Sequence, residues 1–304
     1  GEDNDNRSGR SVYLSADGRI VAIGAWSNGR NDENNNGGYY SGHVRIYQYD
    51  ATKGAAVTDQ SSTTFGPVGW NRLGSDIDGE AQQDWSGFSV SLSADGRTVA
   101  IGALQNDGDG DEIGHVRIYQ YDATKMAAET DQSSATFGPI GWNRLGSDID
   151  GGVGANESGY VVSLSADGRT VAIGAHIMPD GGTTASYANG REKVRIFTYN
   201  STAWSQLGSD IDGEVITNRV GRGRAVYLSA DGRTVAIGTP DIDNGHVRIY
   251  NINSTYSDDD VITFGVVFSE PVNITNTPIF NVLTNIDDDI KEFTYASGDG
   301  TNVL

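Results

Sequence analysis

The sequence predicts an all-β protein made of four repeated units, each a four-stranded antiparallel sheet. A motif of LSADGR, then Ile or Thr, then VAIG and Ala or Thr, occurs at 14–25, 92–103, 164–175 and 228–239. Successive motifs begin 78, 72 and 64 residues apart, which is longer than a helical solenoid unit and long enough for a four-stranded sheet. The 41 glycines and 6 prolines indicate a folded chain rich in turns. Each unit is therefore predicted to be one blade of a β-propeller.

The first two strands of each unit are predicted to form a hairpin. In the second unit, residues 88–92 and 98–103 flank the pair Asp95-Gly96. Asp-Gly between two β-rich runs is typical of a tight turn, because glycine adopts the positive φ that the turn needs. Along 98–103, Val and Ile alternate with Ala and Gly, so large residues share one face and small residues the other. Small residues in place of charges predict a sheet packed between two neighbouring blades.

The third strand of the second unit is predicted at 115–121, and the fourth begins at Trp142. In the third strand, Val116 and Ile118 alternate with Arg117 and Tyr119. This alternation predicts one apolar face and one face that gains solvent further from the propeller axis. Because buried aromatic side chains dominate core energetics, the tryptophan is interpreted as packing between blades and not as a platform for a ligand.

Two domains are predicted. The repeats cover 1–254, with blades at about 9–80, 87–152, 159–214 and 222–253, and the fourth unit lacks the Trp-x-x-Leu-Gly strand. We expect an open arc or a fragment of a larger ring, which leaves apolar faces uncovered on the first and last blades. A four-bladed ring that closes with one three-stranded blade is the alternative. Residues 255–304 are predicted to form a truncated β domain, a small partial β-sandwich.

Charge and composition limit the classes of partner. The 41 acidic and 21 basic residues give a net charge of −20, which argues against nucleic acid, because phosphate binding needs clustered Lys and Arg. The sequence contains no cysteine, which excludes disulfides and thiolate chemistry. No apolar run approaches the length that crosses a bilayer, so we expect no membrane span in this segment. Cations and basic surfaces are better partners for such a chain.

Three stretches of each unit carry a family resemblance. In the second unit they read SGFSV at 86–90, VAIGA at 99–103 and GHVRIY at 114–119, and the pattern recurs four times across 1–253. These units resemble FG-GAP repeats, the blades of integrin α-subunit-like propellers. The resemblance implies a propeller fold and a role in cell adhesion.

The tail carries a second resemblance. It reads ITF at 262–264, FSEPV at 268–272 and YASG at 295–298. Residues 255–304 are similar in these stretches to a truncated bacterial immunoglobulin-like domain. The pairing of both modules is similar to that of large secreted or surface-anchored adhesins. It implies an extracellular or cell-surface location, a binding or spacer role, and a longer parent chain.

Calcium is the only cofactor for which the sequence offers a candidate site. FG-GAP blades often hold Ca²⁺ in the hairpin between their first two strands, but here that hairpin, 93–97, carries one carboxylate beside an arginine. Such cages are not expected, because Ca²⁺ takes six to eight oxygen ligands. The candidate is the loop with Asp107, Asp109 and Asp111, whose alternate carboxylates match the start of a Ca²⁺ loop. A solvated acidic loop is the favoured interpretation.

Two further sets of residues recur in three of the four units and are interpreted as structural. The run at Ser75–Glu80, with Asp76 and Asp78 two residues apart, is predicted to be a turn whose aspartates accept from backbone N–H groups. An ion site at the blade junctions is the alternative. His43, His115 and His246 occupy one repeat position, so they lie on different blades and do not converge as metal ligands.

The variable loops are the part of the repeat that is free to bind a partner. They cover 26–42, 104–114 and 176–192, and Tyr39, Tyr40 and Tyr187 on them are candidates for stacking on a sugar or a protein, against an interpretation as ordinary loop aromatics. No Ser/His/Asp arrangement stands out. We therefore expect a non-catalytic extracellular recognition or adhesion segment that binds protein or glycan. The alternatives are a carbohydrate-active or other hydrolytic propeller enzyme, and a structural spacer.

Overall fold

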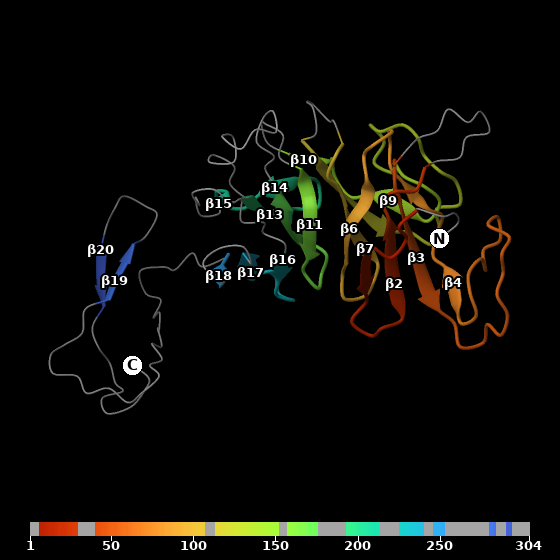
Figure 1. Ribbon diagram of the computed structural model, residues 1–304, viewed down its shortest axis with the longest axis horizontal. Coiled ribbons are helices and arrows are strands. Elements are labelled where there is room, and N and C mark those ends of the chain that lie inside the picture. The colour runs from red at the N-terminus through yellow and green to blue at the C-terminus, as the bar shows by residue number, and fades with distance from the viewer. Residues whose placement is uncertain are drawn as a thin grey trace. The chain divides into compact units, whose positions relative to one another are not determined.

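The computed structural model of the chain describes residues 6–29, 40–106, 113–151, 157–175, 193–212, 225–239, 246–252, 280–283 and 290–293. All regular elements in these ranges are β-strands. The chain divides into two compact units, Gly1–Asn253 and Ser254–Leu304. The first unit contains four antiparallel sheets that follow one another along the chain (Figure 1). The predicted all-β fold of propeller blades is confirmed.

Each sheet is one blade. Blade 1 contains β1 (Ser11–Leu14), β2 (Ile20–Ala25), β3 (His43–Tyr49), β4 (Trp70–Arg72) and β5 (Ile77–Asp78). Blade 2 contains β6 (Ser86–Leu92), β7 (Thr98–Ala103), β8 (His115–Tyr121), β9 (Trp142–Arg144) and β10 (Ile149–Asp150). Blade 3 contains β11 (Ser158–Leu164), β12 (Thr170–Ala175), β13 (Lys193–Tyr199), β14 (Trp204–Gln206) and β15 (Ile211–Asp212). Blade 4 contains β16 (Ala225–Leu228), β17 (Thr234–Thr239) and β18 (His246–Asn251).

The fourth strand of blades 1 to 3 is divided into two short pieces that both pair with the third strand. In blade 2, β9 pairs with the end of β8, where Tyr121 lies opposite Trp142, and β10 pairs with its beginning, where Val116 lies opposite Ile149. The fourth strand that the sequence predicts from Trp142 is confirmed as β9, whereas the second piece, β10, was not predicted. The residues between the two pieces leave the ladder, which brings Asp148 to a side chain of β8.

The turn of the LSADGR motif is held by its own side chains. In blade 1 the Ser15 hydroxyl donates to the Asp17 carboxylate at 2.6 Å, and the backbone N–H of Arg19 donates to the same oxygen at 2.9 Å. Gly18 has a φ of 68°, in the left-handed region that glycine adopts without a Cβ penalty. Equivalent serine-to-aspartate bonds occur in the other three blades. The aspartate therefore serves the turn.

A row of backbone hydrogen bonds joins the four turns. The N–H of Ala16 donates to the carbonyl of Ala94 at 2.9 Å, Ala94 donates to Ala166 at 2.9 Å, and Ala166 donates to Ala230 at 2.8 Å. Each donor lies in one blade and its acceptor in the following blade. The motif that marks the repeat thus also aligns neighbouring blades.

Each blade has a front face, which packs against the preceding blade, and a back face, which packs against the following one. The contact between blades 1 and 2 joins the front-face residues Val90, Leu92, Val99 and Ile101 with the back-face residues Ala22, Val44 and Ile46. The contact between blades 2 and 3 joins Val162, Leu164, Val171 and Ile173 with Ala100, Val116 and Ile118. Blades 3 and 4 pack in the same way. The core of the first unit therefore lies between the blades.

At the ends of the series these faces are uncovered. On the front face of blade 1, Val12 and Leu14 are 55% and 53% exposed, whereas the equivalent residues of blade 2 are 6% and 2% exposed. On the back face of blade 4, Val247 and Ile249 are 66% and 71% exposed, whereas the equivalent residues of blade 2 are 0% and 1% exposed. The described blades form an open series and not a closed ring.

Two of the three tryptophans that begin the fourth strands, Trp142 and Trp204, pack between blades, as predicted. Trp142 is fully buried, and its indole N–H donates to the carbonyl of Leu73 in blade 1 at 3.0 Å. The indole N–H of Trp204 donates to the carbonyl of Leu145 in blade 2 at 2.6 Å. The amphipathic indole thus fills the junction and satisfies a carbonyl of the preceding blade.

The third strand of blade 2 contradicts the prediction that one of its faces gains solvent. Arg117 and Tyr119 are buried, as are Val116 and Ile118 on the other face. The long connection between β8 and β9 covers this side, and the ring of Phe137 lies 5.6 Å from the Arg117 guanidinium. The loop insertion, which the alternation of residues does not reveal, is the reason for the difference.

In the second unit the structure describes one antiparallel pair of strands. β19 (Phe280–Leu283) pairs with β20 (Ile290–Phe293), and Phe280 lies opposite Phe293. The immunoglobulin-like arrangement of 255–304 falls largely outside the described residues and stays a prediction. Across the described ranges, no helix has the length and apolar character needed to cross a membrane.

Candidate functional site

Five aromatic side chains from three blades gather at the end of the inner strands that lies away from the LSADGR turns. Trp26 directly follows β2, Tyr40 precedes β3 and Trp85 precedes β6, whereas Phe88 lies within β6 and Tyr160 within β11. Two arginines lie against these rings. We call this set the aromatic–arginine cluster: Arg7, Arg10, Trp26, Tyr40, Trp85, Phe88 and Tyr160.

The rings form a continuous chain of contacts. The centroid of Trp26 lies 4.5 Å from that of Trp85 and 6.1 Å from that of Tyr40. Phe88 lies 6.3 Å from Trp85 and 5.3 Å from Tyr160. Trp26 is buried, whereas Tyr40 is 43% exposed and the other rings are half-buried. The cluster therefore has an anchored base and an accessible rim.

The two arginines lie over the aromatic faces. The guanidinium carbon of Arg7 is 4.8 Å from the ring centroid of Trp26, and that of Arg10 is 4.6 Å from the centroid of Phe88. Both arginines are exposed. Cation–π contacts of this kind stabilise exposed sites only modestly, so both side chains keep donors that can reach a partner.

Backbone strain is concentrated in the cluster. Arg7, Tyr40 and Trp85 have φ values of 50°, 65° and 56°, and they are three of the six non-glycine residues with positive φ in the described part of the chain. Each such residue costs on the order of 1–3 kcal/mol. The N–H of Trp85 donates to the carbonyl of Tyr40 at 3.0 Å, which joins two of the strained positions. Strain of this kind is typical of functional sites.

The cluster also contains two buried donors that lack an acceptor. Within the described residues, the indole N–H groups of Trp26 and Trp85 are shielded from solvent and have no hydrogen-bond partner. A buried unsatisfied donor costs about 1–3 kcal/mol. Strained backbone and unpaired indoles thus occur together in this cluster.

The residues of the cluster differ between blades, in contrast to the constant LSADGR motif. The repeat position of Phe88 is occupied by Arg10 in blade 1 and by Tyr160 in blade 3. The position of Trp26 is occupied by Leu104 in blade 2. A repeat that is constant in its turns and variable at this end is typical of a scaffold that presents a specific surface.

A buried carboxylate supports the segment that leads into the cluster. Asp84 is almost fully buried, and one of its oxygens accepts hydrogen bonds from the N–H groups of Glu80 and Ala81 at 2.9 and 2.8 Å. Burial raises the pKa of Asp84 above the ordinary range of an aspartate, although these backbone donors oppose that effect. The hydrogen bonds hold the loop directly before Trp85.

A second group of polar side chains lies between blades 1 and 2. Glu80, His115 and Asp148 place ligand atoms within 4.8 Å of one another. Arg117 forms ion pairs with Glu80 and, at 2.6 Å, with Asp148. Burial, together with the charge of Arg117, lowers the pKa of His115 to about 4. Because a guanidinium already neutralises the carboxylates, the group is a structural ion-pair network and does not fit a cation site.

For Asp76, the prediction that backbone N–H groups are its hydrogen-bond partners is wrong. Asp76 was expected to accept from backbone N–H groups. Its carboxylate instead accepts from Arg45 Nη2 at 2.7 Å and from Arg72 at 3.0 Å. The interrupted fourth strand places Asp76 beside the third strand, where two arginines lie, and sequence spacing alone does not show this.

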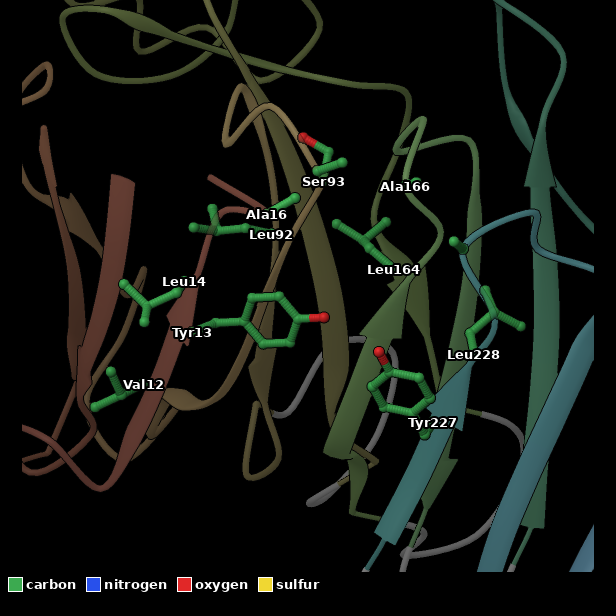
Figure 2. A pocket seen from close by; sticks show the side chains of 12 residues that line it. Val12, Tyr13, Leu14, Ala16, Leu92, Ser93, Leu164, Ala166, Tyr227 and Leu228 are labelled. Atoms are coloured by element: carbon green, nitrogen blue, oxygen red, sulfur yellow. The ribbon is translucent and has the colours of Figure 1, made fainter. Parts of the chain in front are cut away.

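A cavity of about 400 Å³ lies at the other end of the inner strands, beside the LSADGR turns. All four blades contribute to its lining, and Tyr13 and Tyr227 lie on opposite sides of it (Figure 2). The remaining lining residues are alanine, valine, leucine and one serine. This apolar lining lacks the carboxylates on which a hydrolytic propeller would depend.

One of the three tyrosines that the sequence predicts to contact a sugar or a protein lies in the aromatic–arginine cluster. Tyr40 is its most exposed ring. Tyr39 and Tyr187 lie outside the described residues, as do the calcium candidates Asp107, Asp109 and Asp111. Sequence reasoning missed the tryptophans and arginines of the cluster. Departure from the repeat at the tryptophan positions was the signal that could have found them.

No protein-family model matches the sequence. A search of curated proteins also finds no match.

Several solved structures share a general likeness with this chain. Sqt1 from Chaetomium thermophilum matches with a TM-score of 0.43 and 16% identity, over 82% of this chain and 45% of its own. TolB from Acinetobacter baumannii matches with a TM-score of 0.36 and 15% identity, over 96% of this chain and 56% of its own. The Dos1 propeller matches with a TM-score of 0.38 and 9% identity, over 79% of this chain and 44% of its own. The chain thus spans about half the length of these proteins, and its fold assignment rests on the sheets and blade contacts described above.

Proposed function

We propose that this chain is a non-catalytic extracellular recognition segment that binds a partner protein through the aromatic–arginine cluster. The observation that carries the proposal is the exposed ring of Tyr40, held on a strained backbone beside Trp85 and Trp26. Tryptophan, tyrosine and arginine are the residues that contribute most binding energy in protein interfaces. A rim of one exposed ring and two exposed arginines on a buried aromatic base matches that anatomy.

The family resemblance supports the adhesive character of the proposal. The units at 1–253 resemble FG-GAP repeats and the tail resembles an immunoglobulin-like module, a pairing similar to that of secreted or surface-anchored adhesins. The extracellular location belongs to the same proposal. A net charge of −20 makes a partner with a basic surface the better match overall.

The hydrolytic alternative receives less support from the described residues. Asp76 and Asp148, the carboxylates of the blade junctions, are each bonded to two arginines. The cavity beside the LSADGR turns is lined by apolar residues, tyrosines and a serine. The one close pair of carboxylates at these two places, Glu80 and Asp148, is ion-paired with Arg117 and so is poorly suited to general acid and base roles.

A binding screen with a matched variant tests the proposal. The full chain is applied to immobilised extracellular-matrix proteins and to a glycan array, with Ca²⁺ and with a chelator. We expect saturable binding to a protein that Tyr40→Ala weakens by at least about 30-fold. Tyr49→Ala is the control, because Tyr49 is 44% exposed and lies at the far end of β3, the strand that Tyr40 precedes.

Each outcome of the screen separates the alternatives. Binding that occurs only on the glycan array would replace the protein partner by a glycan. Binding that Tyr40→Ala leaves unchanged would exclude the cluster as the site. If neither proteins nor glycans bind under either condition, the spacer interpretation replaces recognition.

A further inference from the structure

The uncovered front face of blade 1 repeats a face that is buried elsewhere in the chain. Val12 and Leu14 occupy the repeat positions of Val90 and Leu92, which pack into the junction between blades 1 and 2. The side chains are identical in the two blades. Their exposure differs only because blade 1 has no preceding blade among the described residues.

The uncovered back face of blade 4 likewise repeats the back face of blade 1. Val247 and Ile249 occupy the positions of Val44 and Ile46, which are buried against blade 2. Tyr227 occupies the position of Tyr13, whereas the two middle blades carry serine there. Tyr13 packs against the junction between blades 1 and 2. Blade 4 therefore presents the set of side chains that already covers a front face within this chain.

The backbone offers a matching hydrogen bond at these faces. In the three internal junctions the turn alanine of one blade donates its N–H to the turn alanine of the next. Among the described residues, the series leaves the N–H of Ala230 and the carbonyl of Ala16 without a hydrogen-bond partner. A bond from Ala230 to Ala16 of a second molecule would continue the row.

The turn glycines show the same steric complementarity. A Cβ on Gly96 would lie 2.7 Å from the side chain of Ile20 in the preceding blade, and the turns of blades 3 and 4 abut the preceding blade in the same way. A Cβ on Gly18 would meet nothing within 4 Å. Thr234 of blade 4 occupies the repeat position of Ile20. The turn of blade 1 thus has an open space that this threonine would border.

We propose that the back face of blade 4 in one copy of this chain docks on the front face of blade 1 in a second copy. We choose a second copy as the partner because the same two interactions, apolar packing and the alanine-to-alanine backbone hydrogen bond, already occur together at the internal junctions. Such a contact joins two different surfaces and is therefore heterologous. The contact is independent of the aromatic–arginine cluster and of any partner bound there.

Sedimentation and light scattering of the full chain between about 1 and 100 μM test the contact, since association is concentration-dependent. We expect the chain to form dimers or larger species. Leu14→Asp on the front face and Ile249→Asp on the back face should each weaken association by at least about 30-fold. Both positions are exposed in the single chain, so neither change disturbs its folding. Met126→Asp, at a residue that is 76% exposed in a loop of blade 2, should assemble like the parent chain.

Mixing the two variants gives the decisive result. The Leu14→Asp chain keeps an intact back face and the Ile249→Asp chain keeps an intact front face, so an equimolar mixture should form one-to-one dimers. A parent chain that remains monomeric at the highest concentration overturns the proposal. Self-association of either variant, or a mixture that stays monomeric, would also overturn it, because a heterologous contact needs both faces.

Discussion

The guanidinium of Arg117 forms two hydrogen bonds with the carboxylate of Asp148, from Nε to Oδ1 at 2.9 Å and from Nη2 to Oδ2 at 2.6 Å. Their side chains are only 6% and 20% exposed. In blade 3 the residue equivalent to Asp148 is Asp210, which pairs with Lys193 at 2.8 Å. That pair is 34% and 31% exposed. The same repeat position thus holds a buried pair in one blade and a surface pair in another.

Removal of the carboxylate should lower the free energy of unfolding more in the buried pair, Arg117 and Asp148, than in the more exposed pair, Lys193 and Asp210. We expect Asp148→Asn to lower the free energy of unfolding by about 3 kcal/mol, because it leaves the buried Arg117 without its main counter-charge. Asp210→Asn should cost less than about 1 kcal/mol, since solvent screens its partner. Urea unfolding followed by circular dichroism measures both. Equal losses would show that burial does not set the value of these pairs.

His115 should make stability depend on pH between about 4 and 6.5. Burial and the charge of Arg117 lower the pKa of His115 to about 4, whereas an unfolded histidine titrates at about 6.5. As the pH falls through this window, the unfolded chain binds a proton that the folded chain does not. Stability should therefore decrease by up to about 3 kcal/mol.

Unfolding curves at several pH values, for the parent chain and for His115→Asn, test this dependence. The variant should lose the slope in that window. The pKa of Asp148 contributes at lower pH: burial acts to raise it, but the hydrogen bonds and charge of Arg117 outweigh burial and lower it below its usual range. Its stabilisation is present above about pH 4 and is lost as the pH falls further. An unchanged slope in His115→Asn would refute the assignment.

Two glycines of the LSADGR motif should differ in their tolerance of a side chain. Gly18 and Gly96 both have a φ of 68°, so alanine at either position carries a strain of about 1–2 kcal/mol. At Gly96 the added Cβ would also lie 2.7 Å from the Cβ of Ile20. We expect Gly96→Ala to lower the free energy of unfolding by about 1–3 kcal/mol more than Gly18→Ala does. Unfolding of both variants is measured at a protein concentration low enough to prevent association between copies. Equal losses in the free energy of unfolding would argue against the close contact between blades 1 and 2.

The blade hairpins could be predicted from the sequence because their determinants are local. Ser15, Asp17 and Gly18 lie within four residues and complete the turn among themselves. The alternation of large and small residues along 98–103 likewise reports directly on two covered faces. Four copies of the same pattern then determine a series of blades.

The ion pairs were harder to predict from the sequence than the hairpins. Arg117 and Asp148 are 31 residues apart, and they meet because the fourth strand is interrupted between β9 and β10. Arg45 and Asp76 have the same spacing in blade 1, so the recurrence was visible in the sequence. The sequence did not show that this recurrence marks an ion pair, because the position of a strand break depends on which backbone groups pair across the sheet.

The sequence by itself determined the all-β class, the repeat and the Asp-Gly turns, because these follow from short-range hydrogen bonds and side-chain alternation. Only the tertiary structure decided which residues form the candidate site and which faces remain open. Trp26 and Trp85 are 59 residues apart and come into contact through the packing of two blades. Leu14 and Leu92 carry the same side chain at the same repeat position, yet one is exposed and the other buried. The difference lies in the neighbouring blade, which is a property of packing and not of local sequence.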